Sequence, residues 1–409
     1  VYWEDGAQIT PPHDKGIMAE VKAITDFSTL KTMQEDNARV ANLFEIIGGA
    51  IDDAYIAELK KQVKNQDAID EMQDQLTVPA RRVLKELGFT HVYVVPEQEL
   101  PDGEFPTVSY PNPEAAEAFE LALALAKEKN ADLVLATDPD ADRLGVYVKD
   151  AKTGEYHSLT GNMSGCLLAE YTISQIKEKK GLPEDGALIK TIVTTNLADA
   201  IAKSYGIRLI ECLTGFKYIG QQILGFEQSG KGTYLFGFEE SYGCLIGTHA
   251  RDKDAIVATM ALCEAAAYYK KQGKTLWDQM LAIYDKYGYY KDSVKSVTMK
   301  GIEGLAKIAQ TMENLRANAP ENIGPYKVLQ ARDYKLDTCK NMETGEVTPT
   351  GLPQSNVLYY DLEDGAWLCV RPSGTEPKIK LYYGVKGSSM EDAENRSAEL
   401  GKYAEALLG

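Results

Sequence analysis

Short apolar runs alternate with longer amphipathic segments through most of the chain. Apolar runs typical of buried strands occupy residues 131–137, 187–194 and 233–238. Between and after them, apolar positions recur at helical spacing in residues 161–179, 197–205 and 252–272. Strands that alternate with helices are characteristic of α/β proteins, in which helices cover a sheet. The pattern therefore predicts α/β layers over the middle of the chain.

The same pattern divides the chain into four segments, 1–74, 75–186, 187–290 and 291–409. The first segment is largely helical and charged, and a polar stretch without strand character closes it. The turn-rich sequence LPEDG separates the second segment from the third. The last segment is rich in strands and has two helices, which predicts a small α+β domain.

The second segment carries the predictions that depend most on local pattern. The run HVYVV at residues 91–95 predicts a strand, and residues 113–129 predict a single long helix. Residues 76–78 have strand character but run directly into a helix that begins at Pro79.

Composition and charge narrow the class of protein. The 409 residues are 44% hydrophobic and 26% charged, which is ordinary for a globular protein. With 44 Lys and Arg against 61 Asp and Glu, the net charge is −17, so we expect neither nucleic acid nor membrane as a partner. No apolar run reaches the ~18 residues of a membrane span. The six Cys form no CxxC pair, which indicates reduced thiols and a cytoplasmic protein. Nothing in the pattern indicates an oligomeric state.

The segment DPDADR, directly after the apolar run 131–137, is the strongest candidate for chemistry. It places Asp138, Asp140 and Asp142 at alternate positions of one tight loop. Three such carboxylates can converge on a hard cation such as Mg²⁺. An EF-hand needs Gly and Glu where this loop has Arg143 and Lys149, so that calcium site is excluded. The position after a buried strand, where α/β proteins bind ligands, favours a Mg²⁺ site over an acidic surface turn.

The segment RPSGTEP, between two apolar strands, is a candidate phosphate site. Arg371 supplies a bidentate cationic fork. Ser373, Gly374 and Thr375 supply hydroxyls and closely spaced N–H groups. A Pro/Gly hairpin with an incidental Arg is the alternative.

The segment GFEESYG is a candidate for sugar recognition. Glu239 and Ser241 place a carboxylate and a hydroxyl two residues apart at the end of an apolar strand. Such a pair suits recognition of neighbouring sugar hydroxyls. Two exposed loop charges, Glu239 and Glu240, are the alternative.

Two further segments carry weaker signals. In HARDKD, Arg251 and Lys253 add positive charge, although the segment also reads as the first turn of a helix. Thr214, Gly215 and Lys217 lie at a strand-to-helix turn, for which helix capping is the simpler explanation.

Taken together and in this order, DPDADR, GFEESYG and RPSGTEP resemble the active-site loops of the α-D-phosphohexomutases, in the phosphoglucomutase/phosphomannomutase branch. The resemblance covers nearly the whole chain. It implies an α/β, four-domain, heart-shaped architecture around one cleft, with three α/β domains of mixed sheets and a C-terminal α+β domain. Residues 1–74 would be the C-terminal part of an incomplete first domain. The metal, sugar and phosphate loops would then belong to segments 75–186, 187–290 and 291–409.

The resemblance also implies an activity and a set of site residues. The activity is the interconversion of hexose 1- and 6-phosphates, here of glucose, with Mg²⁺ and through a phosphoserine. Small hexose phosphates are the implied partners, and glucose 1,6-bisphosphate is the implied intermediate and activator. The implied metal ligands are Asp138, Asp140 and Asp142, with Arg143 lining the same site and Lys253 as general acid or base. The implied substrate contacts are Thr214, Gly215, Lys217, Glu239, Ser241, Arg251, Arg371, Ser373, Gly374 and Thr375.

The chain departs from the family in two places. It has no Thr-Ala-Ser-His-Asn-Pro segment, which carries the phosphorylated serine in the family. At Val78 and Pro79 it also lacks a family strand and a His-Gly loop. Either these segments are missing from the sequence as written, which we favour, or the chain is truncated and is a catalytically inactive sugar-phosphate-binding protein. Glucose and mannose differ at C2, and no residue is assigned to that hydroxyl, so both sugars stay open.

Overall fold

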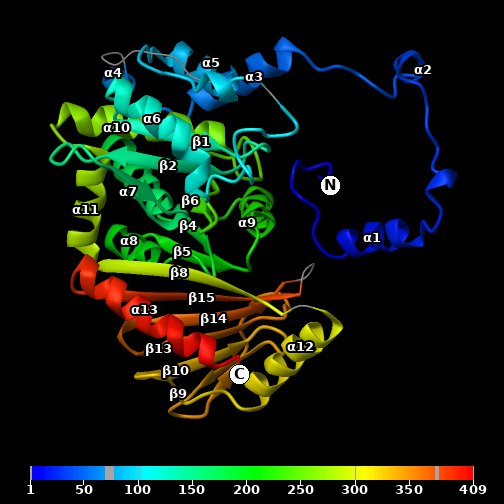
Figure 1. Cartoon of the computed structure of the whole chain (residues 1–409), viewed down its shortest axis with the longest axis vertical. Helices are drawn as coiled ribbons and strands as arrows, with labels where there is room; N and C mark the ends of the chain where they lie inside the picture. The colour runs from blue at the N-terminus through cyan, green and yellow to red at the C-terminus, as the bar shows by residue number, and fades with distance from the viewer. Residues whose placement is uncertain (1, 70–77, 101, 300, 374–376, 409) are drawn as a thin grey trace.

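The structure is a computed structural model that describes residues 2–69, 78–100, 102–299, 301–373 and 377–408. Its N-terminal part is an extended arm that lies apart from the body until the chain returns to the body at α3 (Figure 1). No side chain of α1 or α2 is buried, and large apolar side chains such as Phe27 and Val40 are exposed. The elements of the arm are α1 (His13–Ala23), η1 (Phe27–Thr29) and α2 (Glu35–Val40), and α3 (Gly49–Lys60) and α4 (Gln66–Ile69) follow where the chain rejoins the body.

An antiparallel sheet of three strands, in the order β1-β2-β3, forms the first layer. Its strands β1 and β2 are joined by the tight loop 138–143, and Leu135 lies opposite Val146 in the ladder. The elements of this part are α5 (Val78–Leu87), η2 (Pro96–Gln98), η3 (Ala116–Phe119), α6 (Glu120–Lys129), β1 (Leu133–Thr137), β2 (Leu144–Lys149) and β3 (Tyr156–Leu159).

Two sequence predictions in this part are wrong. Residues 91–95 form no strand, because the described chain offers them no neighbouring strand with which to form a ladder. Residues 113–129 are not one helix, since α6 begins only at Glu120. The Glu117 carboxylate accepts hydrogen bonds of 2.7 Å from the backbone N–H and the hydroxyl of Ser109, which ties the preceding turn to its loop. The predicted strand at 76–78 lies mostly outside the described residues.

A second sheet, with strand order β5-β4-β6-β7, forms the centre of the molecule. Strands β5, β4 and β6 are parallel, β7 is antiparallel, and every residue of β4 is buried. Because the three parallel strands end at one edge, the loops 192–196, 213–215 and 239–243 leave the sheet together. The elements are α7 (Gly161–Lys180), β4 (Gly186–Thr191), α8 (Leu197–Tyr205), β5 (Arg208–Cys212), α9 (Phe216–Ser229), β6 (Thr233–Phe238), β7 (Cys244–Leu245), α10 (Ala255–Lys271) and α11 (Leu276–Tyr287).

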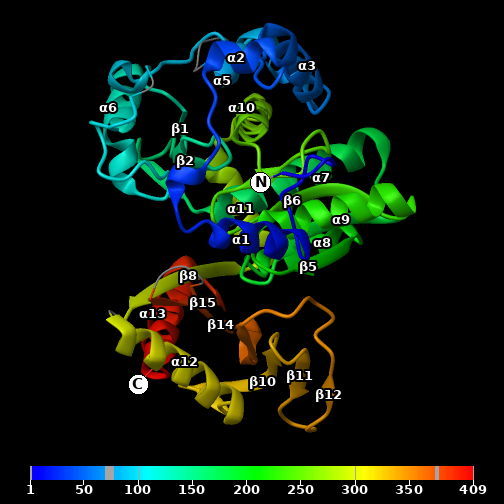
Figure 2. The ribbon, with the colours of Figure 1, turned by 90° about the vertical axis from the view of Figure 1, so that its right-hand side faces the viewer.

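A third sheet, antiparallel throughout, forms the C-terminal domain below the parallel sheet (Figures 1 and 2). Its strand order is β12-β11-β10-β13-β14-β15-β8, with β9 paired to β10. The elements are β8 (Tyr289–Thr298), α12 (Gly301–Ala317), β9 (Asn322–Ile323), β10 (Tyr326–Asp333), β11 (Thr338–Asn341), β12 (Val347–Thr348), β13 (Leu358–Leu362), η4 (Glu363–Gly365), β14 (Trp367–Pro372), β15 (Lys378–Gly387) and α13 (Met390–Ala406). The predicted strand-rich domain with two helices is confirmed.

The apolar core is divided in the same way as the sheets. One cluster runs from α3 to α11, and a second lies between the C-terminal sheet and its helices. A third, smaller cluster joins the two bodies, with Ile192, Val193 and Leu213 packed near Tyr359 and Trp367. None of the described helices is long and apolar enough to cross a membrane. All six Cys are free thiols.

Candidate active site

The acidic loop, residues 138–143, is held in a tight turn between β1 and β2. The Asp138 Oδ1 atom accepts hydrogen bonds of 3.1 Å from the backbone N–H groups of Asp142 and Arg143. Ala141 has a left-handed backbone with φ of 54°, which an L residue rarely adopts and which bends the loop sharply. Asp140 lies exposed in the turn. The turn thus draws Asp138 and Asp142 together and leaves Asp140 outside.

The donor atoms of this loop suit a hard divalent cation. The Oδ1 atom of Asp142 is buried and accepts no hydrogen bond from the described residues. Burial raises the pKa of Asp138, and the neighbouring Asp142 carboxylate raises it further. Hard oxygen ligands with excess negative charge are what Mg²⁺ prefers. Within the described part of the chain, no three His, Cys, Asp or Glu side chains are placed to hold a metal ion, so the three-aspartate site stays a prediction.

The acidic loop is joined directly to the GFEESYG loop, residues 237–243, of the parallel sheet. Arg143 and Gly243 form an isolated antiparallel bridge. The backbone N–H of Leu144 donates to the carbonyl of Tyr242 at 2.9 Å, and the N–H of Glu239 donates to the carbonyl of Gly243 at 2.9 Å. The candidate metal loop and the candidate sugar loop are therefore joined through their backbones.

Lys253 connects the same two loops through its side chain. Its Nζ atom lies 2.9 Å from Asp142 Oδ2 and 2.9 Å from Asp252 Oδ1, and the side chain is 12% exposed. Burial alone would lower the pKa of Lys253, but the carboxylates of Asp252 and Asp142 outweigh burial and raise the pKa well above its usual value. The aliphatic part of the side chain passes against Gly243, where a Cβ would lie 2.7 Å from Lys253 Cγ. Lys253 is therefore a charged donor at the junction of the two loops.

Glu239 is buried at the start of the GFEESYG loop. It is 5% exposed, and its Oε1 atom accepts a hydrogen bond of 3.0 Å from the backbone N–H of Gly215. Gly215 has φ of 118°, which glycine adopts without strain. Burial, and then the neighbouring Glu240 carboxylate, raise the pKa of Glu239 to about 7. The structure thus brings Gly215 beside Glu239, and the roles of Thr214, Gly215 and Glu239 as substrate contacts stay predictions.

Two cations of the predicted set engage the N-terminal arm. Arg251 pairs with Asp5 at 3.2 Å and with Glu227. The Nζ atom of Lys217 lies 4.0 Å from Asp14 Oδ2. Their charges are therefore shared with the arm, and their roles as substrate contacts stay predictions.

The RPSGTEP loop leaves the C-terminal sheet between β14 and β15. Arg371 lies opposite Lys380 in the ladder, and the backbone N–H of Ser373 donates to the carbonyl of Lys378 at 2.8 Å. Burial raises the pKa of Glu240 on the GFEESYG loop, and the nearby Arg371 guanidinium opposes that rise. The role of Arg371 as a phosphate contact stays a prediction. Gly374 and Thr375 lie outside the described residues.

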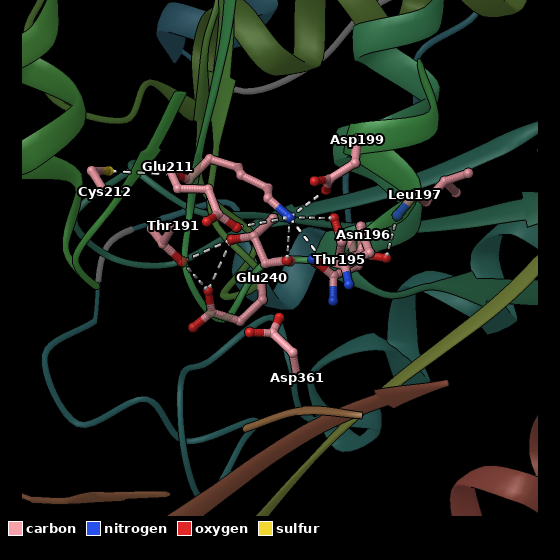
Figure 3. Close-up of polar contacts among 12 residues, drawn as sticks. Thr191, Thr195, Asn196, Leu197, Asp199, Glu211, Cys212, Glu240 and Asp361 are labelled. Carbon is pink, nitrogen blue, oxygen red and sulfur yellow. Dashed lines mark hydrogen bonds and ion pairs between the residues drawn. The ribbon is translucent and has the colours of Figure 1, made fainter. Parts of the chain in front are cut away.

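Sequence reasoning missed the polar cluster at the edge of the parallel sheet beside Glu240 (Figure 3). The hydroxyls of Thr191 and Thr194 donate to Glu240 Oε2 at 3.2 and 3.3 Å. Lys190, which precedes the last residue of β4, is fully buried next to them. A lysine within the run ALIKTIV was the available signal, because buried ammonium groups require partners.

Family models match three parts of the chain. Residues 53–154 match alpha/beta/alpha domain II of phosphoglucomutase/phosphomannomutase, residues 160–287 match its alpha/beta/alpha domain III, and residues 305–400 match its C-terminal domain. The chain belongs to the phosphoglucomutase/phosphomannomutase family. This is a family of phosphohexomutase enzymes, so the resemblance drawn from the three loops is confirmed. The domain boundaries drawn from the sequence stay predictions.

Individual relatives carry both names of the family. A "Probable phosphomannomutase" of Haemophilus influenzae is 36% identical over 411 residues, which cover 98% of this chain and 76% of that protein. A "Phosphoglucomutase" of Staphylococcus aureus (strain MRSA252) is 36% identical over 314 residues, or 77% of this chain. The match covers only 55% of that phosphoglucomutase.

Solved structures of the family share the fold. The open form of parafusin from Paramecium, a phosphoglucomutase by name, aligns with a TM-score of 0.59 at 18% identity, over 86% of this chain and 62% of that one. A phosphoglucomutase/phosphomannomutase family protein from Burkholderia thailandensis aligns with a TM-score of 0.54 at 17% identity, over 87% and 64%. These likenesses confirm the α/β phosphohexomutase architecture.

Proposed function

We propose that this protein is a Mg²⁺-dependent phosphohexomutase that interconverts glucose 1-phosphate and glucose 6-phosphate. The observation that carries the proposal is the convergence of loops at Lys253. Its ammonium contacts the acidic loop at Asp142, while its stem lies against Gly243 of the GFEESYG loop. A metal-type loop, a buried cation and a sugar-type loop in one place are what transfer of a phosphoryl group to a sugar hydroxyl requires.

The residues of the site divide the work of this reaction. Asp138, Asp140 and Asp142 would hold Mg²⁺, which when bound neutralises charge on the transferring phosphoryl group. Carboxylate neighbours raise the pKa of Lys253, so it would stay charged and act as a hydrogen-bond donor to the transferring phosphoryl group rather than as a base. Glu239 would accept a hydrogen bond from a sugar hydroxyl.

The phosphate that is not transferred needs a separate grip. Arg371 supplies a bidentate fork for it at the end of β14, beside Ser373. The new bond forms between a sugar hydroxyl oxygen and phosphorus, the bond from phosphorus to a serine oxygen breaks, and the hydroxyl proton ends on that serine oxygen. Hexose 1,6-bisphosphate is the intermediate that can turn over and present its other phosphate.

Two alternatives rest on specific observations. The relatives carry both family names, which supports phosphomannomutase activity as the second candidate. The joined loops alone would also suit a sugar-phosphate-binding protein without turnover, which is the third candidate. In each case the partners would be small hexose phosphates, and the free thiols support a cytoplasmic location.

Phosphorus NMR with calorimetry separates these candidates. The protein is incubated with Mg²⁺, a trace of glucose 1,6-bisphosphate and either glucose 1-phosphate or mannose 1-phosphate. Faster formation of the glucose 6-phosphate supports the leading proposal, and faster formation of the mannose product supports the alternative enzyme. Binding without turnover, together with an intact mass near 45.0 kDa, identifies the binding protein. If the protein neither binds nor converts these hexose phosphates, all three candidates are refuted.

A further inference from the structure

A fully buried lysine, Lys190, is the centre of a polar cluster at the end of β4. Figure 3 labels its partners Asn196, Asp199 and Glu211. Its side chain is 0% exposed. The Nζ atom donates to the Asp199 carboxylate and to the Asn196 amide oxygen at 2.9 Å, and it lies 3.4 Å from Glu211 Oε1. It also donates to two backbone carbonyls of loop 192–196 at 3.4 Å each. The Lys190 ammonium is thus surrounded by oxygen acceptors of the parallel-sheet domain.

The cluster keeps Lys190 charged. A buried ammonium without partners is strongly unfavourable, and burial by itself lowers the pKa of Lys190. The carboxylates of Glu211 and Asp199 outweigh burial and raise the pKa above its usual value. None of the steps proposed above uses this charge, so Lys190 needs another explanation.

One side of the cluster reaches the GFEESYG loop. Thr194, whose carbonyl accepts from Lys190, donates through its hydroxyl to Glu240 Oε2, and Thr191 next to Lys190 donates to the same atom. The chain neighbours of Glu240 are the two residues assigned to the sugar. Two hydrogen bonds therefore separate the buried ammonium from the candidate sugar contacts.

The other side of the cluster reaches the C-terminal domain. Glu211 Oε2 lies 3.3 Å from Arg332 Nη1 on β10, so the Glu211 carboxylate is shared between Lys190 and Arg332. Arg332 is held in turn by a bidentate pair with Asp361 on β13, at 2.8 and 2.7 Å. This ionic chain runs beside the apolar cluster that joins the two bodies.

We propose that Lys190 is a positioning residue that couples the C-terminal domain to the sugar loop. Through Glu211 it seats Arg332 of the C-terminal sheet, and through loop 192–196 it orients Glu240. A change at the domain interface is then transmitted to the sugar loop by contacts within the parallel sheet. The structural part of this inference is independent of the proposed function, and the kinetic part rests on it.

Hydrogen exchange on the whole protein tests the structural part. Arg332→Gln removes the interdomain ion pair from a side chain that is 23% exposed, so the fold should survive. We expect the N–H groups of Glu239 and Thr194, both hydrogen-bonded in the structure, to exchange about 5- to 20-fold faster. The matched control is Arg396→Gln, which removes ion pairs to Asp364 and Asp392 within the same domain. Unchanged exchange of the two N–H groups in Arg332→Gln, or equal acceleration in Arg396→Gln, overturns the coupling.

Lys190→Met tests the hub itself. It should accelerate the same N–H groups at least as much as Arg332→Gln, and the double variant should exchange no faster than Lys190→Met alone. Additive acceleration would mean that two separate effects are present and would overturn the proposal. If Lys190→Met fails to fold, Arg332→Gln still decides. In enzyme assays of these variants we expect KM for the hexose phosphate to rise about tenfold, with kcat changed less than threefold. If the unmodified protein shows no turnover, the proposed function is refuted, but the hydrogen-exchange result still tests the coupling.

Discussion

Replacing Gly243 by Ala tests whether Lys253 must pass the sugar loop to reach the acidic loop. An added Cβ would lie 2.7 Å from Lys253 Cγ and closer still to Cδ. Gly243 does not have a positive φ, so its backbone accepts an L residue without strain. The perturbation is therefore a displacement of one side chain.

The size of the effect follows from the contacts of Lys253. Non-bonded carbon atoms settle about 3.5–4.0 Å apart, so Lys253 Cγ must move by about 1 Å and Cδ by more. That movement breaks one of the two 2.9 Å ion pairs of Nζ, to Asp142 or Asp252, and a hydrogen bond between charged groups contributes about 1.5–3 kcal/mol. A catalytic group misplaced by about 1 Å loses about 10²-fold in rate, or about 2.7 kcal/mol. We expect Gly243→Ala to lower kcat/KM by about 10²-fold.

Gly225→Ala is the matched control for this variant. Gly225 lies in α9, no atom is within 4 Å of its ideal Cβ, and Ala is favoured over Gly inside a helix by about 0.5–1 kcal/mol. Both variants are compared by conversion of glucose 1-phosphate in a coupled assay and by thermal unfolding. Gly243→Ala should fold and lose activity, and Gly225→Ala should keep it. Equal activity of the two variants would refute the role of Lys253 at the loop junction.

Three further changes test the other loops. Asp140→Asn removes one carboxylate of the predicted Mg²⁺ site and should abolish turnover at ordinary Mg²⁺. Because Asp140 is exposed, the melting temperature should not fall. Retained turnover would show that the acidic loop is only a surface turn. Folding raises the pKa of Glu239 from 4.5 to about 7. Between these two pH values the folded state binds a proton that the unfolded state has lost. The free energy of unfolding therefore falls by about 3 kcal/mol as the pH rises from 4.5 to about 7. Glu239→Gln should remove that fall, measured by urea unfolding at about pH 5 and about pH 8. It should also weaken hexose phosphate binding while inorganic phosphate still competes. An unchanged pH dependence of stability would contradict the burial of the Glu239 carboxylate. Arg371→Lys keeps the charge and loses the fork, so kcat/KM should fall about 10- to 100-fold at constant Mg²⁺ affinity, and full activity would return RPSGTEP to a structural hairpin.

Local pattern was sufficient for the elements whose signals lie within the element itself. The helix Leu197–Tyr205 and the strand Thr233–Phe238 have the bounds that the sequence predicts, and the helix Leu276–Tyr287 also begins at a local signal. Their ends carry their own signals, such as the capping box of Thr275 and the left-handed Gly206. The three loop motifs were legible for the same reason, because each is a contiguous run of residues.

Contacts between loops were decided by the tertiary structure alone. The bridge from Arg143 to Gly243 and the ion pair from Lys253 to Asp142 join residues that lie far apart in the sequence. They exist because the edge of the parallel sheet meets the loop between β1 and β2, and no local propensity encodes that meeting.

Residues 91–95 and Lys190 are two further cases in which the local sequence does not determine the tertiary contacts. The run HVYVV has the composition of a strand, yet a strand exists only where a neighbour accepts its hydrogen bonds. A lysine in a buried strand indicates that its ammonium has polar partners, but the sequence alone does not identify these partners. The fold supplies Asp199, Glu211 and, through Glu211, a second domain, because charge must be compensated wherever packing excludes water.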